Sequence, residues 1–582
     1  MKKLKHKIES FILSHLFKNT YLHFCSIISD CEQLLENKQR NEEEIKQLKE
    51  IGQKQENEII SLKELNNINE EKMIEYVKIC ETKDQQMVQF AEKNLEQELQ
   101  INQYREKNQK QEIQIKQYEK DIVKSHETIL LLNSYILGKE ANDFSNMGRF
   151  SYECLHGILE TNEQIGLEAF KKITSDIYQY NIEVIKNKSK IKIAFLSPLS
   201  STWSCDSLFK KLALNDSFDT YIIVVPFEYG NDRRIIDDEY RSTCDFFDKK
   251  KYKYIKSYHL ENKKYLTYEE AGAPDVIFHL TPHTVHIPLN FRIDSIHLDV
   301  LNVYIPYGYM IVNEYERQFN QKSHHLFWKI FCETPLHKKM AKEHSKIEDI
   351  NVECSGYVKM DQFLDDSKTK MIDQIWKIHK MNSNPDEIIK VIWAPHHSIF
   401  EESSSFGTFH KNFMFFYELA KSRPEISWIV KPHSLLKNHS IYTGVFKNNE
   451  EYEDYINKWD ELPNARTIQD GNYIDIFKTS DAMILDSVSF LAEYLFTQKP
   501  CLFLTSSYNT FNDFGMTIKE SHYQTDGNNF DEIENFIDKV LVEKNDSMKE
   551  VRGKIYNKYL NFNNGLLASE YIYKYLSDSF NK

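Results

Sequence analysis

The spacing of apolar residues changes character near residue 190. Before that point, aliphatic residues are sparse among Glu, Lys, Gln and Asn, and they recur at helical intervals. After it, short runs of β-branched and aromatic residues alternate with helical stretches, a pattern typical of α/β domains. The first of the 13 prolines is Pro198, and proline disfavours helix interiors. The pattern therefore predicts a helical N-terminal part followed by a globular body.

Seven-residue repeats run through residues 29–135. One frame places on the seam Ile45, Leu48, Ile59, Leu62, Met73 and Tyr76, and a second places there Ile101, Tyr104, Ile115, Tyr118, Ile122, Ile129 and Leu132. Polar residues, including Asn108 and Gln111, interrupt the seams. Because buried polar residues set register and partner number, we predict a coiled coil of modest stability that makes the protein a homo-oligomer. A single solvated helix or a partly disordered segment is the alternative.

Residues 1–28 are basic and amphipathic. Four lysines at positions 2, 3, 5 and 7 precede an apolar stripe of Ile8, Phe11, Ile12, Leu16 and Phe17. This composition suits a helix that lies on an anionic membrane face, and the alternative is a helix packed on the protein's own core. A helical connector is predicted over 136–189. No apolar run is long enough to span a bilayer, so we predict a cytoplasmic protein with peripheral contact at the inner face of the cell membrane.

Two successive strand–helix series make up the body, over 190–368 and 369–582. Strands are predicted at 190–198, 221–226, 275–280, 301–305 and 327–331, and again at 388–393, 426–430, 481–485 and 500–504. The expected fold class is α/β, with two doubly wound Rossmann-like domains that face a cleft. This arrangement resembles the glycosyltransferase-B (GT-B) architecture, and the sheets are preceded by the long helical arm.

Composition narrows the classes of function. The sequence has 74 Lys and Arg against 88 Asp and Glu, a net charge of -14, which argues against a nucleic-acid partner. Nine cysteines occur without the spacing of a structural zinc site. No Gly-x-Gly-x-x-Gly follows a predicted strand, so an ordinary dinucleotide site is not expected. The sequence predicts neither a metal nor a cofactor.

Three loops of the second series follow predicted strands and carry polar side chains. Their residues are Pro395-His396-His397-Ser398, Lys431-Pro432-His433-Ser434 and Asp486-Ser487-Val488-Ser489. Lysine, hydroxyl groups and backbone N–H groups at such loops suit a phosphate ligand. Each signal alone has a structural alternative, because the histidines can be satisfied loop residues and Asp486 can be a helix N-cap.

The second half resembles the CDP-glycerol glycerophosphotransferase family, which includes the teichoic acid and capsule polymerases. The resemblance rests on VIWAPHHS at 391–398, WIVKPHSLL at 428–436 and YIDIFKTSDAMILDSVSFLAEYLFTQKP at 473–500, and runs from about residue 275 to the C-terminus. It implies transfer of a polyol phosphate from a CDP-alcohol to a hydroxyl of a polymer or lipid-linked acceptor, with release of CMP. The first domain would face the acceptor and the second the nucleotide donor.

The resemblance also implies roles for individual residues. His433 is the first candidate for phosphate contact or proton transfer, and His396 and His397 are further catalytic candidates. The implied substrate-binding residues are Lys431, Asp486, Ser487, Ser489, Glu493, Tyr307 and Gly308. Glu493 would accept ribose hydroxyls, or else be a surface acid.

One loop departs from the family pattern. Better-known members carry Trp-His-Gly-Thr-Pro in the first domain, but here Tyr307 stands where the histidine would fall. An unperturbed tyrosine is a poor base at neutral pH. His396, His397, His279 or His283 would then take that role, or the reaction differs. Two alternatives follow: a nucleotide-sugar glycosyltransferase of surface polysaccharide synthesis, or a non-catalytic coiled-coil scaffold.

Overall fold

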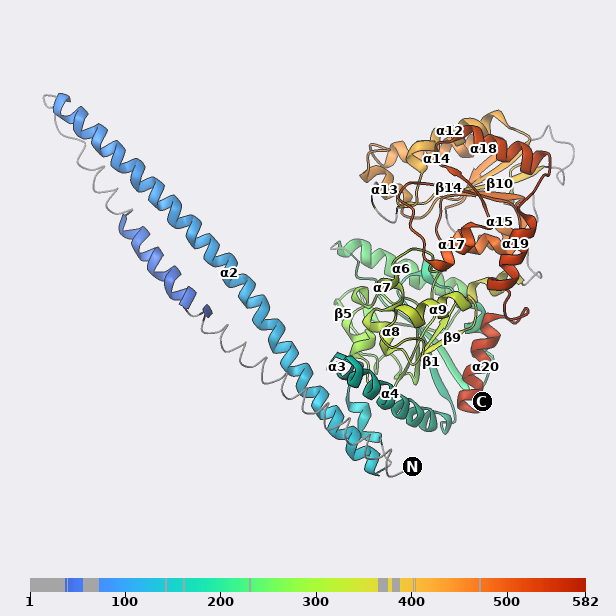
Figure 1. Ribbon diagram of the computed structural model, residues 1–582, viewed down its shortest axis with the longest axis horizontal. Coiled ribbons are helices and arrows are strands. Elements are labelled where there is room, and N and C mark those ends of the chain that lie inside the picture. Colours follow the sequence, from blue (N-terminus) through green and yellow to red (C-terminus); the bar gives the residue numbers. More distant parts are fainter. Residues whose placement is uncertain are drawn as a thin grey trace. The chain divides into compact units, whose positions relative to one another are not determined.

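The computed structural model describes two compact units, residues 1–173 and 174–582 (Figure 1). The described residues are 37–38, 40–55, 73–141, 144–160, 163–229, 232–364, 375–378, 388–400, 402, 405–469 and 473–582. The membrane-binding helix predicted over 1–28 lies outside these residues. Among the described helices, none combines the length and the apolar composition that crossing a bilayer requires.

The first unit is helical. Its elements are a helical segment over 40–55, α2 (Met73–Ala141), η2 (Ser145–Arg149), α3 (Tyr152–Glu160) and the start of α4 (Glu163–Lys186). Several contacts join the segment before residue 55 to α2 within one chain. Lys38 pairs with Glu112 at 3.2 Å, the Asn41 amide donates to Asn108 at 3.1 Å, and Glu44 raises the pKa of Tyr104 through a hydrogen bond. Later residues of the segment meet earlier residues of α2, so the two run antiparallel.

The segment before residue 55 and α2 together form an antiparallel hairpin. The α2 positions that are shielded from solvent in it are those of the predicted seven-residue repeat. Between residues 101 and 118, the α2 positions shielded from solvent are Ile101, Tyr104, Asn108, Gln111, Ile115 and Tyr118. These include the two polar interruptions, and the Asn41 amide also donates to Gln111 at 3.3 Å. A polar pair inside a seam fixes its register, because any shift would leave a shielded amide without a partner. The described seam is thus occupied within the chain, and homo-oligomerisation stays a prediction.

The second unit contains two parallel sheets. The first has the order β3-β2-β1-β6-β7-β8-β9. Its strands are β1 (Ile191–Ser197), β2 (Phe218–Val224), β3 (Tyr254–Lys256), β6 (Val276–His279), β7 (Leu301–Tyr304), β8 (Lys329–Cys332) and β9 (Val352–Cys354), beside a small hairpin of β4 (Tyr258–His259) and β5 (Lys264–Tyr265). The main helices are α5 (Asp206–Ala213), α6 (Arg233–Lys250), α7 (Tyr315–Phe319), α8 (Lys322–Leu326), α9 (Pro335–His344), η7 (Val358–Met360) and α10 (Asp361–Leu364).

The second sheet repeats the plan with the order β12-β11-β10-β13-β14-β15. Its strands are β10 (Ile389–Ala394), β11 (Ile426–Val430), β12 (Ala465–Thr467), β13 (Ala482–Leu485), β14 (Cys501–Thr505) and β15 (Tyr523–Asp526). The helices are α12 (Phe409–Ser422), α13 (Leu436–Tyr442), α14 (Asn449–Glu461), α15 (Ile474–Thr479), α16 (Phe490–Tyr494), α17 (Asp513–Lys519), α18 (Phe530–Asn535), α19 (Lys549–Ile555) and α20 (Ala568–Phe580).

The predicted fold class is confirmed. Each sheet is parallel throughout, and its strand order reverses beside the first strand of the domain, β1 or β10, as in doubly wound α/β folds. The central strands are buried along nearly their whole length because helices cover both faces of such sheets. The architecture is GT-B-like, preceded by a long N-terminal helical region.

The C-terminal helix corrects the predicted assignment of 369–582 to the second domain. Ile572, Leu576 and Phe580 of α20 are buried in the core that also contains β1 and β2 of the first sheet. At the start of α20, the Asp361 carboxylate accepts the backbone N–H groups of Ala568 and Ser569, each at 2.9 Å. The chain therefore returns to the first domain, because the apolar face of α20 completes that core.

The antiparallel hairpin predicts where a crosslink will form. A chain carrying Lys38→Cys and Glu112→Cys, with Cys25, Cys31 and Cys80 changed to Ser, is expected to form a disulfide within one chain on oxidation. Mass spectrometry of a mixture of 15N-labelled and unlabelled chains measures this, because an intrachain bond yields no mixed-isotope crosslinked peptides. A statistical fraction of mixed peptides would show instead that the pairing joins two chains.

Candidate functional site

The candidate loops meet at one edge of the second sheet. β11, β10 and β13 are neighbours in that order, and all three are parallel, so their carboxyl ends lie at the same edge. The loops that follow begin at Pro395, Lys431 and Asp486. The Lys431 N–H donates to the Trp393 carbonyl at 2.8 Å, and the His433 N–H donates to the Pro395 carbonyl at 3.1 Å. The sheet and these bonds bring the three predicted loops together.

Asp486 is the buried link between these loops. Its side chain is 1% exposed, and its carboxylate accepts the His396 N–H at 2.6 Å and the Thr408 hydroxyl at 2.8 Å. The Thr408 backbone N–H also donates to it. Burial raises the pKa of Asp486 to about 6, against the lowering effect of these donors. The carboxylate therefore orders the loop that carries His396, and Thr408 is a supporting residue that the sequence patterns did not indicate.

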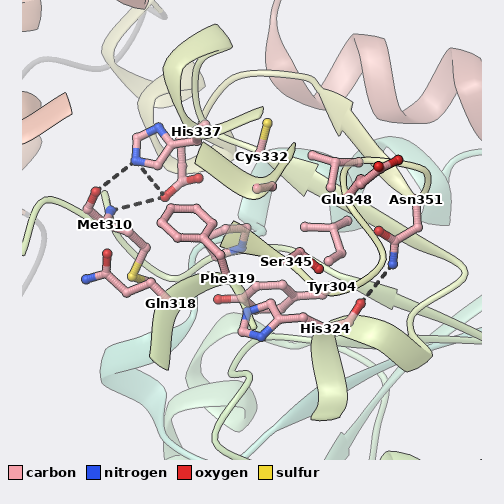
Figure 2. Close-up of a pocket in the computed structure, with 15 residues that line it drawn as sticks. Tyr304, Met310, Gln318, Phe319, His324, Cys332, His337, Ser345, Glu348 and Asn351 are labelled. Atoms are coloured by element: carbon pink, nitrogen blue, oxygen red, sulfur yellow. Dashed lines mark hydrogen bonds and ion pairs between the residues drawn. The ribbon is translucent and has the colours of Figure 1, made fainter. Parts of the chain in front are cut away.

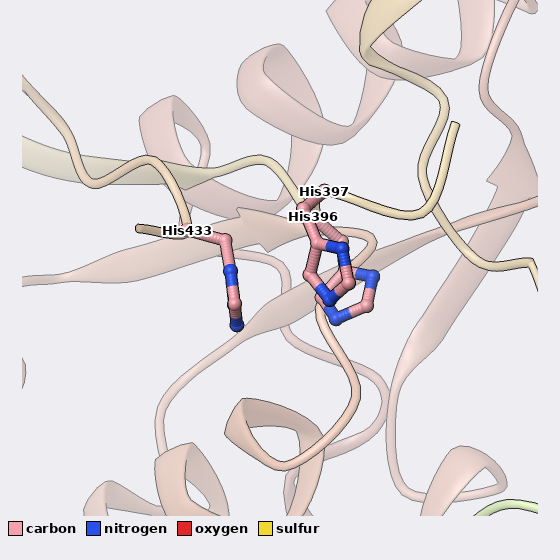
Figure 3. Close-up of side chains that lie close together, drawn as sticks. All are labelled: His396, His397 and His433. Carbon is pink, nitrogen blue, oxygen red and sulfur yellow. The ribbon is translucent and has the colours of Figure 1, made fainter. Parts of the chain in front are cut away.

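Three histidines from two of the loops form a cluster (Figure 3). One ring nitrogen from each of His396, His397 and His433 lies within 4.8 Å of the others. The ring centroids are 4.3 Å apart for His396 and His397, 4.2 Å for His397 and His433, and 5.1 Å for His396 and His433. In Figure 3 the His433 ring lies to the left of the His396 and His397 rings, which overlap in this view. The structure thus brings together the three predicted catalytic residues.

Hydrogen bonds at Nδ1 determine the tautomer of two of these rings. The Nδ1 of His433 accepts the Leu435 N–H at 3.2 Å, and the Nδ1 of His396 accepts the Ser398 N–H at 3.3 Å. The Ser398 hydroxyl lies 2.7 Å from the same Nδ1 and accepts the Phe406 N–H, so its own proton can be donated to His396. A backbone N–H can only donate, so both Nδ1 atoms lack a proton. A neutral imidazole carries one proton, which must then be on Nε2.

The tautomer of the third ring, that of His397, follows from its contact with His439. The Nδ1 of His439 lies 3.0 Å from the His397 carbonyl oxygen, which can only accept, so this Nδ1 carries a proton. The same proton also faces the Nδ1 of His397 at 3.0 Å, in a shared hydrogen bond for which His397 is the second acceptor. His397 in its neutral form accordingly carries its proton on Nε2. His439, on α13, is a supporting residue that the sequence reasoning missed.

The cluster is a set of neutral N–H donors. Burial lowers the pKa of His433 to about 4 and that of His397 to about 3, and it lowers the pKa of His396 well below its usual value. At neutral pH all three rings are uncharged, and with Nδ1 hydrogen-bonded each has an Nε2–H group as its remaining donor. A cluster of such donors suits an oxyanion, such as a phosphate oxygen.

The same tautomers are unfavourable for binding a metal ion. A metal bound at Nε2 needs the lone pair on that nitrogen and a proton on Nδ1, but Nδ1 is already occupied as an acceptor in each ring. The three side chains could hold a transition metal only after these hydrogen bonds are broken.

The other residues predicted to bind substrate from these loops differ in their exposure to solvent and in their hydrogen bonds. The Lys431 ammonium donates to the Gln469 carbonyl at 2.6 Å, beside His433, whose pKa its charge also lowers. Ser487 is 8% exposed, and Ser489 is partly exposed at the start of α16. Glu493 is only 2% exposed and accepts the Tyr473 hydroxyl. The alternative that Glu493 is a surface acid is therefore wrong, because its carboxylate is buried. The hydrogen bond from Tyr473 satisfies this buried group.

The Tyr307–Gly308 loop of the first domain approaches this region. A Cβ on Gly308 would lie 3.7 Å from the Cβ of Ser489, which is ordinary van der Waals contact, so this loop of the first domain lies against the start of α16 in the second. The Tyr307 carbonyl accepts the Tyr357 hydroxyl at 2.5 Å. Burial raises the pKa of Tyr307, although 37% of the residue remains exposed. The surroundings therefore do not turn its phenol into a base.

The other two histidine candidates lie in the first domain. His279 ends β6, is 2% exposed, and is hydrogen-bonded through Nε2 to the Asn302 side-chain oxygen at 2.8 Å. The Nδ1 of His283 lies 3.3 Å from the Gln321 amide nitrogen. Neither is among the three clustered histidines.

A small cavity of about 20 Å³ lies in the first domain beside β8 and α9 (Figure 2). Buried Glu333 lines it, accepts the Met310 N–H at 3.2 Å and lies 3.7 Å from the Nε2 of His337. Burial raises the pKa of Glu333 to about 8, so this carboxyl group can hold a proton at neutral pH. Sequence reasoning did not select Glu333, since a glutamate after a strand looks like any loop residue.

Removal of the Asp486 carboxylate should destabilise the domain. Asp486→Ala leaves the His396 N–H and both Thr408 donors without their acceptor, and we expect the free energy of unfolding to fall by about 1–3 kcal/mol. Urea unfolding followed by circular dichroism measures this. Ser487→Ala, which truncates the adjacent side chain, is the matched control and should change stability much less. Equal stability of Asp486→Ala and the wild type would contradict the linking role.

Comparison with known proteins supplies no identity. The sequence matches no family model and no curated protein. Similar solved structures include the UDP-GlcNAc 2-epimerase from Neisseria meningitidis bound to UDP-GlcNAc, with 15% identity, 67% of this chain and 100% of that chain covered, and a TM-score of 0.43. The wall teichoic acid polymerase TagF shares 13% identity over 71% of this chain and 94% of its own, with a TM-score of 0.42. A glycosyltransferase from Rickettsia africae shares 14% over 67% and 99%, with a TM-score of 0.38. Similarities this low carry no argument about substrate.

Proposed function

We propose that the protein is a transferase that uses a nucleotide-activated donor and binds the donor's diphosphate at the histidine cluster. The observation that carries this proposal is the cluster of His396, His397 and His433 at the carboxyl edge of a parallel sheet, with one ring nitrogen of each within 4.8 Å of the others and Nδ1 hydrogen-bonded in every ring. Ligands of such sheets bind at that edge, and N–H donors in a water-poor site stabilise phosphate oxygens.

The motif resemblance favours a CDP-alcohol as the donor. An acceptor hydroxyl would attack the β-phosphorus, forming an O–P bond while the bond to the CMP oxygen breaks. CMP would leave with the bond's electron pair, and the hydroxyl proton would pass to a base. A ring that carries its proton on Nε2 can donate to phosphate but cannot accept a proton there. The histidine cluster therefore serves phosphate contact, and the base lies elsewhere.

Incubation with CDP-alcohols and nucleotide sugars tests this assignment. With a suitable hydroxyl acceptor, release of CMP is expected from a CDP-alcohol, whereas release of a nucleoside diphosphate would indicate sugar transfer. Failure to turn over any activated donor while binding none would contradict the proposal.

Loss of one N–H donor should slow the transfer. His433→Ala is expected to lower kcat/KM by about 10²–10³-fold, because a donor to the developing phosphate charge is removed. His433→Gln, whose amide can still donate, should retain part of the activity. His259→Ala, an exposed histidine on β4, is the control. Wild-type rates in His433→Ala would reject the role of the cluster.

Donor binding should take up protons. The phosphate charge stabilises imidazolium, whose second proton would sit on Nδ1 and replace the hydrogen bond accepted there. It therefore raises the low pKa values of His433 and His397, and the complex is more protonated than the free protein near pH 6. Calorimetry with CDP-glycerol in buffers of different ionisation enthalpy measures this. The diphosphate of CDP-glycerol does not ionise near pH 6, so the protons taken up are those of the protein. Proton release on binding would have the wrong sign for an anion site, and cytidine alone should give no uptake.

A further inference from the structure

A lysine of the first domain lies beside the candidate donor loop without a charged partner in contact. The Lys359 ammonium is 4.4 Å from the centre of the Tyr473 ring, in the second domain. Among the residues that the structure describes, it makes no hydrogen bond, and no carboxylate oxygen lies within 4.0 Å of it. Sequence reasoning gave Lys359 no role.

The fold holds this side chain in place. Val358 and Met360, on either side of Lys359 in η7, are 0% and 2% exposed, whereas Lys359 itself is only partly buried. The Ser207 hydroxyl donates to the Val358 carbonyl at 3.3 Å and to the Asp361 carboxylate at 3.1 Å. Val358 belongs to the core of the first domain and Met360 is buried, and the Lys359 ammonium reaches the Tyr473 ring of the second domain.

The surroundings of the ammonium connect it to the donor loop. Tyr473 donates its hydroxyl hydrogen bond to Glu493, and Glu493 is also hydrogen-bonded to Ser489, the last residue of the loop that begins at Asp486. The backbone of Gly308 approaches Ser489 from the first domain. Lys359 therefore lies where both domains meet the far end of that loop.

The charge of Lys359 is incompletely balanced in this position. Removal of an ammonium from water is costly unless a counter-charge or hydrogen bonds replace the water. The Tyr473 ring offers a cation–π contact, and Glu493 acts on the lysine only from beyond ion-pair distance. An oxyanion that enters from the donor loop would supply the missing contact.

We infer that Lys359 is a further donor-binding residue, which contacts the diphosphate from the first domain while the histidine cluster contacts it from the second. This inference rests on the proposed function. The loop from Asp486 to Ser489 spans at most about 11 Å, because each residue adds no more than about 3.6 Å. The His396 backbone contact is at one end of that loop. Ser489, at the other end, is connected to the Lys359 ammonium through Glu493 and Tyr473, so a donor that lies along the loop would approach both groups.

Calorimetric titration with inorganic pyrophosphate and with CDP-glycerol tests the role of Lys359. Lys359→Met is expected to weaken binding of both probes by about 10–100-fold, the usual effect of losing a charge-assisted hydrogen bond. Lys359→Arg should recover part of the affinity. The matched control is Lys558→Met, which removes an exposed lysine that also lies over a tyrosine ring, 4.8 Å from its centre, and it should bind as the wild type does.

A melting experiment separates ligand binding from a purely structural role. Without ligand, Lys359→Met should melt at or above the wild-type temperature, and it should lose the rise that pyrophosphate gives the wild type. A lower melting temperature, restored by adding Glu493→Gln, together with unchanged affinity would overturn the inference and leave the proposed function standing. If the wild type binds pyrophosphate but not CDP-glycerol, the donor class fails and Lys359 remains an anion contact. If it binds neither, both fail.

Discussion

A single buried carboxylate, that of Asp486, holds together the loops from which the candidate site is built. It accepts two backbone N–H groups and one hydroxyl from segments about 80–90 residues away in the sequence. A buried acceptor of this kind is expensive to leave unsatisfied, so the arrangement of donors around it is strongly favoured. His396 takes its backbone position from this contact. The family resemblance implies that Asp486 binds the donor substrate. In the structure its carboxylate orders the loops of the site.

The chemistry of the histidine cluster depends on the hydrogen bonds that the Nδ1 atom of each ring makes. Three rings close together suit a metal, a base or an anion, and the types of residue alone do not distinguish these ligands. Hydrogen bonds at Nδ1 do distinguish them, because they leave the proton of each neutral ring on Nε2. Each neutral ring then has an N–H donor, not a free lone pair, at Nε2. Sequence reasoning left phosphate contact and proton transfer open for His433, and these hydrogen bonds support the proposal of phosphate contact.

The central strands could be predicted from the sequence, but the edge strands could not. β1, β2, β10 and β11 are buried apolar runs, because helices cover both sides of the sheet centre. The four strands at the sheet edges, β3, β9, β12 and β15, have three or four residues each and retain partly exposed positions, so no apolar run marks them. Heptad spacing likewise identified the helical seam but carried no information on whether its partner lies in the same chain. Motifs placed His433 and Asp486 in the site, whereas Thr408, His439 and Lys359 become visible only through contacts across the fold.

Nuclear magnetic resonance of the free protein, with 15N-labelled histidine, tests the central claim most directly. Two-bond correlations between ring nitrogens and ring protons distinguish the two neutral tautomers, and His433→Gln, His396→Gln and His397→Gln variants assign the signals. At neutral pH the Nε2–H tautomer is predicted for all three rings. Rings that carry the proton on Nδ1 would contradict a cluster of N–H donors and would favour a metal or base role.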